Sequence, residues 1–303
     1  LHTIHFESDL VGRFAAVGTS VPVLSSLVNT SYDAVRLKDP RIRPWKLEMV
    51  RLADAWTGRH LNTHFHAISP AVKEASSRAL GLDPERITVV ERGRETGRLG
   101  LPSLEDRAQA RQKLGLGDDD QVVLNVARQE FQKGQRYLLE ACPALMTSRP
   151  RVRVLIAGRT GNATGELQST MSRLGLGERV RFLGHRDDVP TLLAAADVFA
   201  FPSLYEGLGG AVLEAMAMEV PIVASSLPAL RDYLEDGESA SLVPPESPEA
   251  LAEGIVRTLD EPEMARRLAR RSREVFESRF TMDQSVAGMV ALYRRVANQG
   301  GAG

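Results

Sequence analysis

The sequence has little of what marks several classes of protein. Cysteine occurs once, at Cys142, which excludes an internal disulfide and suits a reducing compartment. Aromatic residues make up 5% of the chain, and no stretch of 18 residues is apolar and uncharged, so the sequence offers no candidate for a membrane-spanning helix. The formal net charge of -1 gives no overall field that would attract nucleic acid. The start, LHTIHFESD, has no signal-peptide pattern and no methionine, so we expect a piece of a longer protein.

The second half alternates apolar runs of strand length with segments of helical period. With 303 residues, 43% of them apolar, the chain is long enough for two domains. Runs rich in Val, Ile, Leu and Ala suit strands that are covered on both faces, and helical segments at 134–146 and 187–196 lie between them. This alternation predicts an α/β fold with a doubly wound parallel sheet. The expected strands are 122–126, 152–157, 180–183, 197–201 and 220–224.

The first ninety residues predict part of a second α/β unit. Strands are expected at 21–24, 65–68 and 87–90, and helices at 9–17, 44–57 and 70–80. So few strands make only a thin sheet, and the chain starts almost inside a strand. We therefore expect that an N-terminal portion of this domain is absent. The predicted organisation is an incomplete first domain (1–95), a linker rich in charge and glycine (96–120), a second domain (121–275) and a terminal helix (276–303), with the tail from 248 to 297 wholly helical.

One motif joins the end of a predicted strand to the start of a helix. It reads PSLYEGLGGAVLEAM over 202–216 and carries Glu206, Glu214 and glycines at 207, 209 and 210. Ligands of open α/β sheets bind at the carboxyl ends of strands, and a helix start favours phosphate or sugar oxygens. Two carboxylates at separate points suit a ligand with two sets of hydroxyls, such as a nucleoside diphosphate sugar. A plain glycine-rich turn with two solvated glutamates remains the alternative.

A second motif, ARQEFQKG over 127–134, has the same strand-to-helix context. Arg128 offers a fork for phosphate oxygens and Lys133 a compact positive charge. Fixed cations there would stabilise a departing diphosphate. Taken alone, an arginine and a lysine near a helix start are more often surface charges.

Together these motifs resemble the GT-B glycosyltransferases of family 4. That family carries an Arg-x4-Lys-Gly loop and then a Glu-x7-Glu motif, matched by Arg128, Lys133 and Gly134 and by Glu206 and Glu214. Further matches are RFLG at 181–184, ADVF at 196–199 and LVPP at 242–245, and the resemblance is close over about 120–260. It implies a GT-B fold of two Rossmann-like domains, with the first domain on the acceptor side and the terminal helix returning to it.

The resemblance also implies a role for each matching residue. Arg128 and Lys133 would hold the donor diphosphate. Glu206 would lie beside the donor sugar and Glu214 would bind the ribose hydroxyls. Backbone contacts to the donor are expected from Gly207, Leu208, Gly209, Gly210 and His185. His2 and His5 match only by position and are candidates for the acceptor side; plain surface histidines are the alternative.

The implied activity is retaining transfer of a hexose-like sugar from a UDP, GDP or ADP sugar to a hydroxyl of a glycan or lipid-linked acceptor. No bound cofactor or metal is expected. Arginine far outnumbers lysine, as in GC-rich bacterial genomes, which favours polysaccharide or glycolipid synthesis in the cytoplasm or at the inner face of the membrane. Two rivals remain open, a GT-B-like nucleotide-sugar epimerase and a fragment that binds donor without turnover.

Several segments depart from the family pattern or mimic other sites. Ala127, Gln132 and the pair Pro228-Ala229 replace a glycine, a glutamate and a Gly-Gly pair that many members carry. The glycines of 158–165 have the wrong spacing for a dinucleotide fingerprint, and the acidic run 118–120 is interpreted as a solvated turn rather than a metal site. The basic segment 36–46 could meet an anionic membrane or a lipid diphosphate, or could be a solvated loop.

Overall fold

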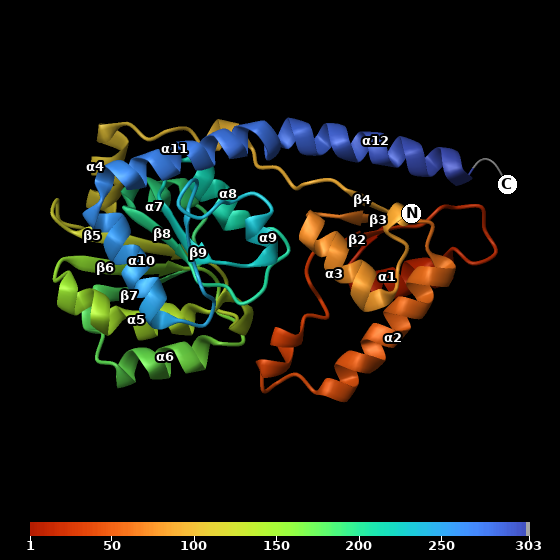
Figure 1. Ribbon diagram of the computed structural model, residues 1–303, viewed down its shortest axis with the longest axis horizontal. Coiled ribbons are helices and arrows are strands. Elements are labelled where there is room, and N and C mark those ends of the chain that lie inside the picture. The colour runs from red at the N-terminus through yellow and green to blue at the C-terminus, as the bar shows by residue number, and fades with distance from the viewer. Residues whose placement is uncertain (301–303) are drawn as a thin grey trace. The chain divides into compact units, whose positions relative to one another are not determined.

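The computed structural model describes residues 1–300, and side chains through residue 298. It separates into two compact units (Figure 1). The first unit comprises residues 1–93, 205–208 and the chain from 279 onward; the second comprises 94–204 and 209–278. None of the helices in the described part of the chain combines the length and the hydropathy needed to cross a bilayer.

The first unit is built on a parallel sheet of order β1-β2-β3-β4. Its strands are β1 (His2–Ile4), β2 (Leu24–Leu27), β3 (His64–Ala67) and β4 (Ile87–Val89). The helices α1 (Phe6–Ala15), α2 (Pro44–Leu61) and α3 (Pro70–Leu80) connect consecutive strands. The last helix, α12 (Met282–Gly300), packs on this sheet through Leu292 and Val296, which meet Leu24 in a small buried cluster.

The second unit is built on a parallel sheet of order β10-β9-β8-β5-β6-β7. Its strands are β5 (Gln121–Val126), β6 (Val152–Ala157), β7 (Val180–Gly184), β8 (Val198–Phe201), β9 (Ile222–Ser225) and β10 (Ser241–Val243). Its helices are α4 (Leu104–Lys113), α5 (Gln135–Ser148), α6 (Thr164–Arg173), α7 (Val189–Ala195), α8 (Gly210–Ala217), α9 (Pro228–Arg231), α10 (Pro248–Asp260) and α11 (Pro262–Arg279). Leucines of α5 and α10 join valines of β5 and β6 in one buried core.

The order of strands in the second sheet reverses beside β5. From β5 the chain moves outward through β6 to β7, then returns to β8 on the other side of β5 and continues to β9 and β10. In open α/β sheets, ligands bind outside the carboxyl ends of the strands at such a switch point. The segments 127–134 and 202–204 follow β5 and β8 within the second unit, so they lie at this point of the sheet.

Most expected elements are present, and β2 is the clearest correction. The expected strand at 21–24 instead lies at Leu24–Leu27. Pro22 has no N–H to donate to a ladder, whereas Ser25 and Ser26 enter the strand because their buried hydroxyls find partners in Asn62 and His66. The observed strand therefore begins three positions after the expected one, where side chains distant in the sequence provide hydrogen-bond partners. The short strand β10 was not expected either.

The segment expected as a linker, 96–120, contains the helix α4. Ser103 and Asp106 form a reciprocal cap at its start. Because the residues of such a cap are polar, this stretch of the sequence resembles a loop. Arg107 then donates to the carbonyl of Ala196 (2.8 Å) and pairs with Asp197, which fixes α4 beside α7 within the second unit.

Candidate functional site

The loops that follow β5 and β8 are fastened to each other. The backbone N–H of Leu204 donates to the Gln132 carbonyl at 2.8 Å. Gly134 has φ of 57°, and a Cβ at this position would lie 2.0 Å from the carbonyl oxygen of Pro202. Only glycine fits there, because the conformation is left-handed and the backbone of the other loop leaves no room. The two predicted motifs of the second unit therefore form one surface.

Lys133 and Arg128 supply the positive charge of this surface. The Lys133 ammonium lies 5.8 Å from the ring centroid of Phe201, the last residue of β8, which places the charge at the end of that strand. Arg128 lies in the exposed part of the loop, and its guanidinium is 3.5 Å from the Glu130 carboxylate. The Lys133 ammonium thus lies beside the end of β8, while the Arg128 side chain is largely exposed to solvent.

Buried polar side chains hold the switch point beneath these cations. Asn125 of β5 donates to the Ala200 carbonyl of β8 at 2.9 Å, and the amide of Gln135 donates to the Asn125 side chain at 2.9 Å. Two buried atoms next to this network, Gln135 Oε1 and Ser203 Oγ, have no hydrogen-bond partner within the described residues. Buried polar atoms are usually paired, so this end of the sheet has unused hydrogen-bonding capacity.

The glycine-rich segment 158–165 supports the Arg128 loop. Gly158 has φ of 151°, and a Cβ there would lie 1.8 Å from the Ala127 carbonyl oxygen. The backbone N–H of Gln129 donates to the Arg159 carbonyl, and Asn162 accepts from the N–H of Phe131. The close approach to Ala127 gives Gly158 a packing role beneath the Arg128 loop.

The helix α8 presents an N-terminus without a side-chain cap to the same edge of the sheet. Its N-cap Gly209 has φ of 80°, and Gly210 is its first residue. Glu214, about one turn into α8, pairs with Arg94, whose Nε is 2.9 Å from Oε1. A Cβ on Gly210 would lie 1.8 Å from Nη2 of Arg94, so this guanidinium also covers the start of the helix. No motif in the sequence points to Arg94, which is a lone arginine between elements.

His185 lies on an exposed turn after β7 in the second unit. Its Nε2 is 3.2 Å from the Arg159 guanidinium and 3.1 Å from the Asp187 carboxylate. The preceding Gly184 has φ of 67°, and its carbonyl accepts from the N–H of Gly158 at 2.7 Å. The turn is therefore joined through its backbone to Gly158, the glycine that packs against the Arg128 loop.

Glu206 belongs to the short segment Tyr205–Leu208, which is grouped with the first unit. The carbonyl of Gly207 accepts from the Ser69 hydroxyl at 2.7 Å, and a Cβ on Gly207 would lie 2.2 Å from the Val28 carbonyl oxygen. Glu206 itself is buried, with 6% of its surface exposed. A glutamate so enclosed is not one of the two solvated glutamates of the alternative interpretation.

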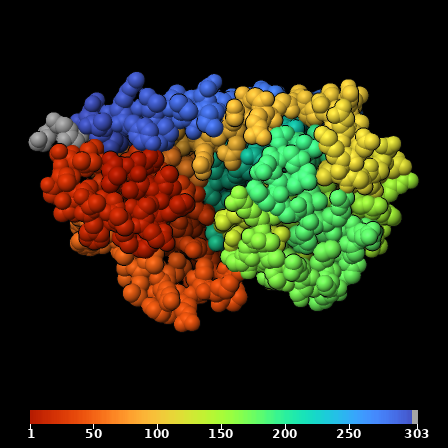
Figure 2. Space-filling view, turned by 180° about the vertical axis from the view of Figure 1, so that it is seen from behind, coloured from red at the N-terminus to blue at the C-terminus, as the bar shows by residue number. Residues whose placement is uncertain are grey.

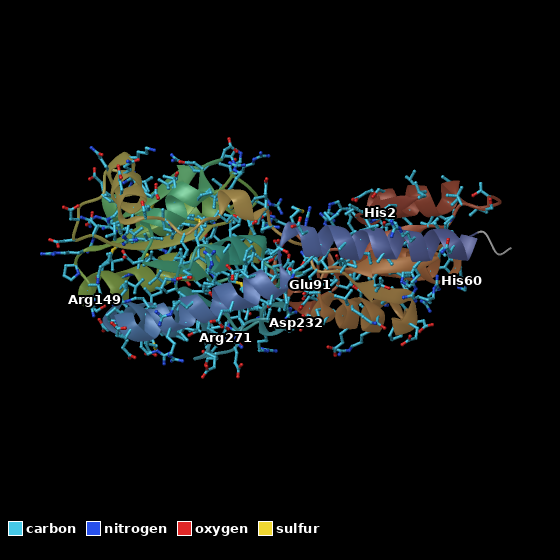
Figure 3. The ribbon with its side chains drawn as sticks, turned by 90° about the horizontal axis from the view of Figure 1, so that it is seen from above. His2, His60, Glu91, Arg149, Asp232 and Arg271 are labelled. Carbon is cyan, nitrogen blue, oxygen red and sulfur yellow. The ribbon has the colours of Figure 1, made fainter. Side chains whose placement is uncertain are left out.

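The histidines His2 and His66 share the hydroxyl of Ser26. His66 Nε2 must donate to the Val90 carbonyl, at 2.8 Å, so its Nδ1 accepts from Ser26. The Ser26 oxygen then accepts from His2 Nε2, and His2 Nδ1 accepts from the Tyr293 hydroxyl of α12. Burial lowers the pKa of both imidazoles, in agreement with these neutral tautomers. His2 (labelled in Figure 3) therefore links β1 to α12.

His5 occupies a different position. It is the N-cap of α1, with φ of 77° and ψ of 150°, and its side chain makes no capping hydrogen bond. A non-glycine residue with positive φ is uncommon and is often kept for a functional reason. His5 also lines a pocket of the first unit. Among the described residues, no group of three or more His, Cys, Asp or Glu side chains has an arrangement that could hold a metal.

Comparisons with known proteins show which family the chain resembles. The family model for glycosyl transferases group 1 matches residues 106–275. The chain is 30% identical over 192 residues to the alpha-D-kanosaminyltransferase of Streptomyces kanamyceticus, covering 63% of this chain and 49% of that protein. It is 34% identical over 227 residues to a D-inositol 3-phosphate glycosyltransferase of Segniliparus rotundus, covering 73% and 49%. The chain thus spans about half the length of these curated relatives.

Solved structures resemble the chain over nearly its whole length. Anabaena HepE in complex with UDP and glucose superposes with a TM-score of 0.85 at 24% identity, over 97% of this chain and 78% of that one. Sucrose-phosphate synthase of Thermosynechococcus elongatus gives 0.83 at 25% identity, over 98% and 73%. The fold class is GT-B, as expected, with two Rossmann-like units on parallel sheets. The chain belongs to the glycosyl transferases group 1 family.

Proposed function

We propose that this chain belongs to a retaining glycosyltransferase of family 4 that moves a hexose-like sugar from a nucleoside diphosphate to an acceptor hydroxyl. Arg128 and Lys133 bind the diphosphate, and Glu214 binds the ribose hydroxyls. Glu206 lies beside the donor sugar. Backbone groups of Gly207 to Gly210 and of the His185 turn complete the donor site. Bacterial polysaccharide or glycolipid synthesis, in the cytoplasm or at the inner face of the membrane, is the proposed setting.

The observation that carries this proposal is the fastening of the two loops at the switch point of the second sheet. Lys133, the start of α8 and Glu214 follow strands β5 and β8, which are neighbours there. A cation and an uncapped helix start suit phosphate oxygens, and a carboxylate farther along the helix suits hydroxyls. Fixed positive charge would stabilise the leaving diphosphate, with no nucleophilic role for Glu206.

Calorimetric titration of the whole chain with UDP, GDP and ADP tests the donor site. HepE was crystallised with UDP, which makes UDP the first nucleotide to try. We expect one nucleotide to bind selectively and Lys133→Ala to weaken binding by about tenfold, because a charge-assisted hydrogen bond is worth roughly 1.5–3 kcal/mol. Lys113→Ala, which removes a lysine of α4 in the same unit, is the matched control. Equal effects of the two variants, or no binding at all, would contradict the proposal.

Donor turnover distinguishes the remaining activities. The chain is incubated with UDP-glucose without acceptor and the products are followed by NMR. An isomerised nucleotide sugar would identify an epimerase, and binding without any transfer under all acceptors tried would identify a donor-binding fragment. When an acceptor is glycosylated, the anomeric proton coupling of the product reports retention or inversion directly.

We propose further that the first unit contacts an anionic membrane through α2. Trp45, Met49, Leu52 and Trp56 follow one another at helical spacing, and each has more than half of its surface exposed. Arg43 and Lys46 lie at the start of the same helix. The N-terminal segments of this unit are the red to orange atoms in Figure 2. An apolar stripe beside basic residues is typical of helices that lie in the membrane interface.

The chain offers a direct probe for this contact, because its two tryptophans, Trp45 and Trp56, both lie on the stripe. Vesicles containing phosphatidylglycerol should shift tryptophan emission to the blue, whereas phosphatidylcholine vesicles should not. Leu52→Gln should reduce the shift without removing a fluorophore. Unchanged emission with anionic vesicles would disprove the contact.

A further inference from the structure

The loop that carries Arg128 and Lys133 is closed at its base by a buried side chain. Gln135, the first residue of α5, donates through Nε2 to the carbonyl of Ala127 at 3.1 Å. Ala127 directly precedes Arg128, and Gln135 follows Lys133 by two positions. This hydrogen bond therefore joins the two ends of the loop and limits how far the backbone at the two cations can move apart.

A second buried amide ties this base to the neighbouring strand. Nε2 of Gln135 also donates to Oδ1 of Asn125 at 2.9 Å, and Nδ2 of Asn125 donates to the Ala200 carbonyl at 2.9 Å. A carbonyl can only accept, so the backbone oxygens determine which way each amide faces. Ala200 directly precedes Phe201, the ring over which the Lys133 ammonium lies. The pair Asn125–Gln135 therefore holds both the base of the loop and the strand end beside Lys133.

Stability alone would not favour this pair of amides. Asn125 and Gln135 are 0% and 1% exposed, and Gln135 Oε1 has no hydrogen-bond partner among residues 1–298. An unpaired buried polar atom costs free energy, and apolar side chains of the same shape would avoid that cost. Leucine and methionine have the shapes of asparagine and glutamine. What the amides provide instead is a defined arrangement of the backbone carbonyls that they hold.

We infer that Asn125 and Gln135 are positioning residues for the diphosphate of the donor. The inference rests on the proposed function and deepens it. Because both side chains are buried, they act through Arg128 and Lys133, whose relative position they set before the diphosphate arrives. Cations that are already in place bind a ligand, and stabilise charge that develops on it, without the cost of reorganisation.

Calorimetric titration of the whole chain with UDP, and competition of uridine against UDP, tests this role. Gln135→Met keeps the shape of the side chain and removes both donors. We expect it to weaken UDP binding by about tenfold, because the loop must then be ordered when the ligand binds. Uridine binding should be unchanged, because uridine lacks the diphosphate.

Thr258→Val in α10 is the matched control. It removes a buried hydrogen bond of 2.8 Å, donated to the Gly254 carbonyl, in the same unit and outside both loops. We expect it to lower stability, as Gln135→Met does, and to leave the affinities for UDP and uridine as they are in the unmodified chain.

A double variant separates positioning from a purely structural role. Gln135→Met or Asn125→Leu alone leaves a buried polar partner unpaired and should lower the urea midpoint, whereas the two together remove both amides and should recover much of that stability. UDP binding should stay about tenfold weaker in the double variant, because the loop is still not held. Recovery of UDP affinity together with stability would overturn the inference, as would loss of UDP and uridine binding by the same factor.

Binding by the unmodified chain distinguishes failure of this inference from failure of the donor site. If the unmodified chain does not bind UDP, the donor site is wrong and the positioning role falls with it. If the unmodified chain binds UDP, and Gln135→Met binds it as tightly as Thr258→Val does, the donor site stands and the positioning role alone is wrong.

Discussion

At the scale of single residues, the proposed donor site depends on side chains that hold one another in place. Glu214 meets the Arg94 guanidinium through Oε1. A carboxylate fixed at one oxygen keeps its rotamer and presents the other oxygen to a ligand. Arg94 is therefore a positioning residue for the proposed recognition of ribose.

We expect Arg94→Ala to weaken UDP and uridine binding by the same factor, about threefold to tenfold, because the ribose contact is common to both ligands. In a Glu214→Ala background the same substitution should have little effect. Calorimetry of the four proteins of this double-mutant cycle measures the coupling. A loss confined to UDP would instead mean that Arg94 binds phosphate.

His64 predicts a pH dependence of stability. The imidazole is buried in β3, its Nε2 is 2.7 Å from the Thr88 hydroxyl, and burial, followed by the charges of Arg295 and Arg86, lowers its pKa to about 4. As the pH falls below 6.5, His64 becomes protonated in the unfolded chain but stays neutral in the folded protein. The free energy of unfolding therefore decreases as the pH falls from 6.5 to 4. The cost is about 3 kcal/mol at full titration.

Urea denaturation between pH 4 and 7 measures this cost. In His64→Gln, which keeps a hydrogen-bonding group near Thr88 but does not titrate, the decline in unfolding free energy should be shallower. Parallel curves for the two proteins would show that His64 is not the responsible group.

At the scale of elements, the contact between the loops that follow β5 and β8 depends on Gly134. Gly134→Ala introduces a Cβ into the Pro202 carbonyl in addition to a left-handed conformation. Gly115 is a matched control, because it has φ of 62° and no atom within 4 Å of an added Cβ. We expect Gly115→Ala to cost about 1–2 kcal/mol of stability, Gly134→Ala to cost more, and only Gly134→Ala to weaken nucleotide binding. Thermal melts and UDP titrations of the two variants provide the comparison.

The sequence predicted well those elements that its periodicity alone determines. Val152–Ala157 and Pro70–Leu80 lie where the apolar pattern put them. The elements that differ depend on partners remote in the sequence. Ser25 and Ser26 lie in β2 because their hydroxyls form hydrogen bonds with Asn62 and His66. The charged segment around Ser103 is helical because of its cap and its contact with α7.

The candidate site shows the same division. Lys133, Gly134 and Glu214 could be found by their spacing around strand ends, because local chain geometry brings them to one edge of the sheet. Arg94 lies 120 residues before Glu214, and its role follows only from the folded structure.

At the scale of the whole molecule, the charged residues proposed to bind the nucleotide, Arg128, Lys133 and Glu214, lie in the second compact unit. Ligand that binds only the folded state adds about 2.7 kcal/mol at a hundredfold excess over its dissociation constant. In differential scanning calorimetry we expect UDP to raise the unfolding temperature of the second unit and to leave that of the first unit unchanged. If UDP shifts a single common transition, the two units unfold together. If UDP shifts no transition, the assignment of the nucleotide to the second unit is wrong.

The division of the chain also bears on the order in which the protein is made. The first unit uses residues from both ends of the sequence, whereas the second is nearly continuous between them. On the ribosome, the sheet of β1 to β4 emerges early, but Leu24 stays uncovered until α12 follows almost two hundred residues after β4. The nascent first unit therefore keeps part of its core open to chaperones throughout the synthesis of the second unit. A premature stop before α12 should leave a chain that binds hydrophobic dye even after its second unit has folded.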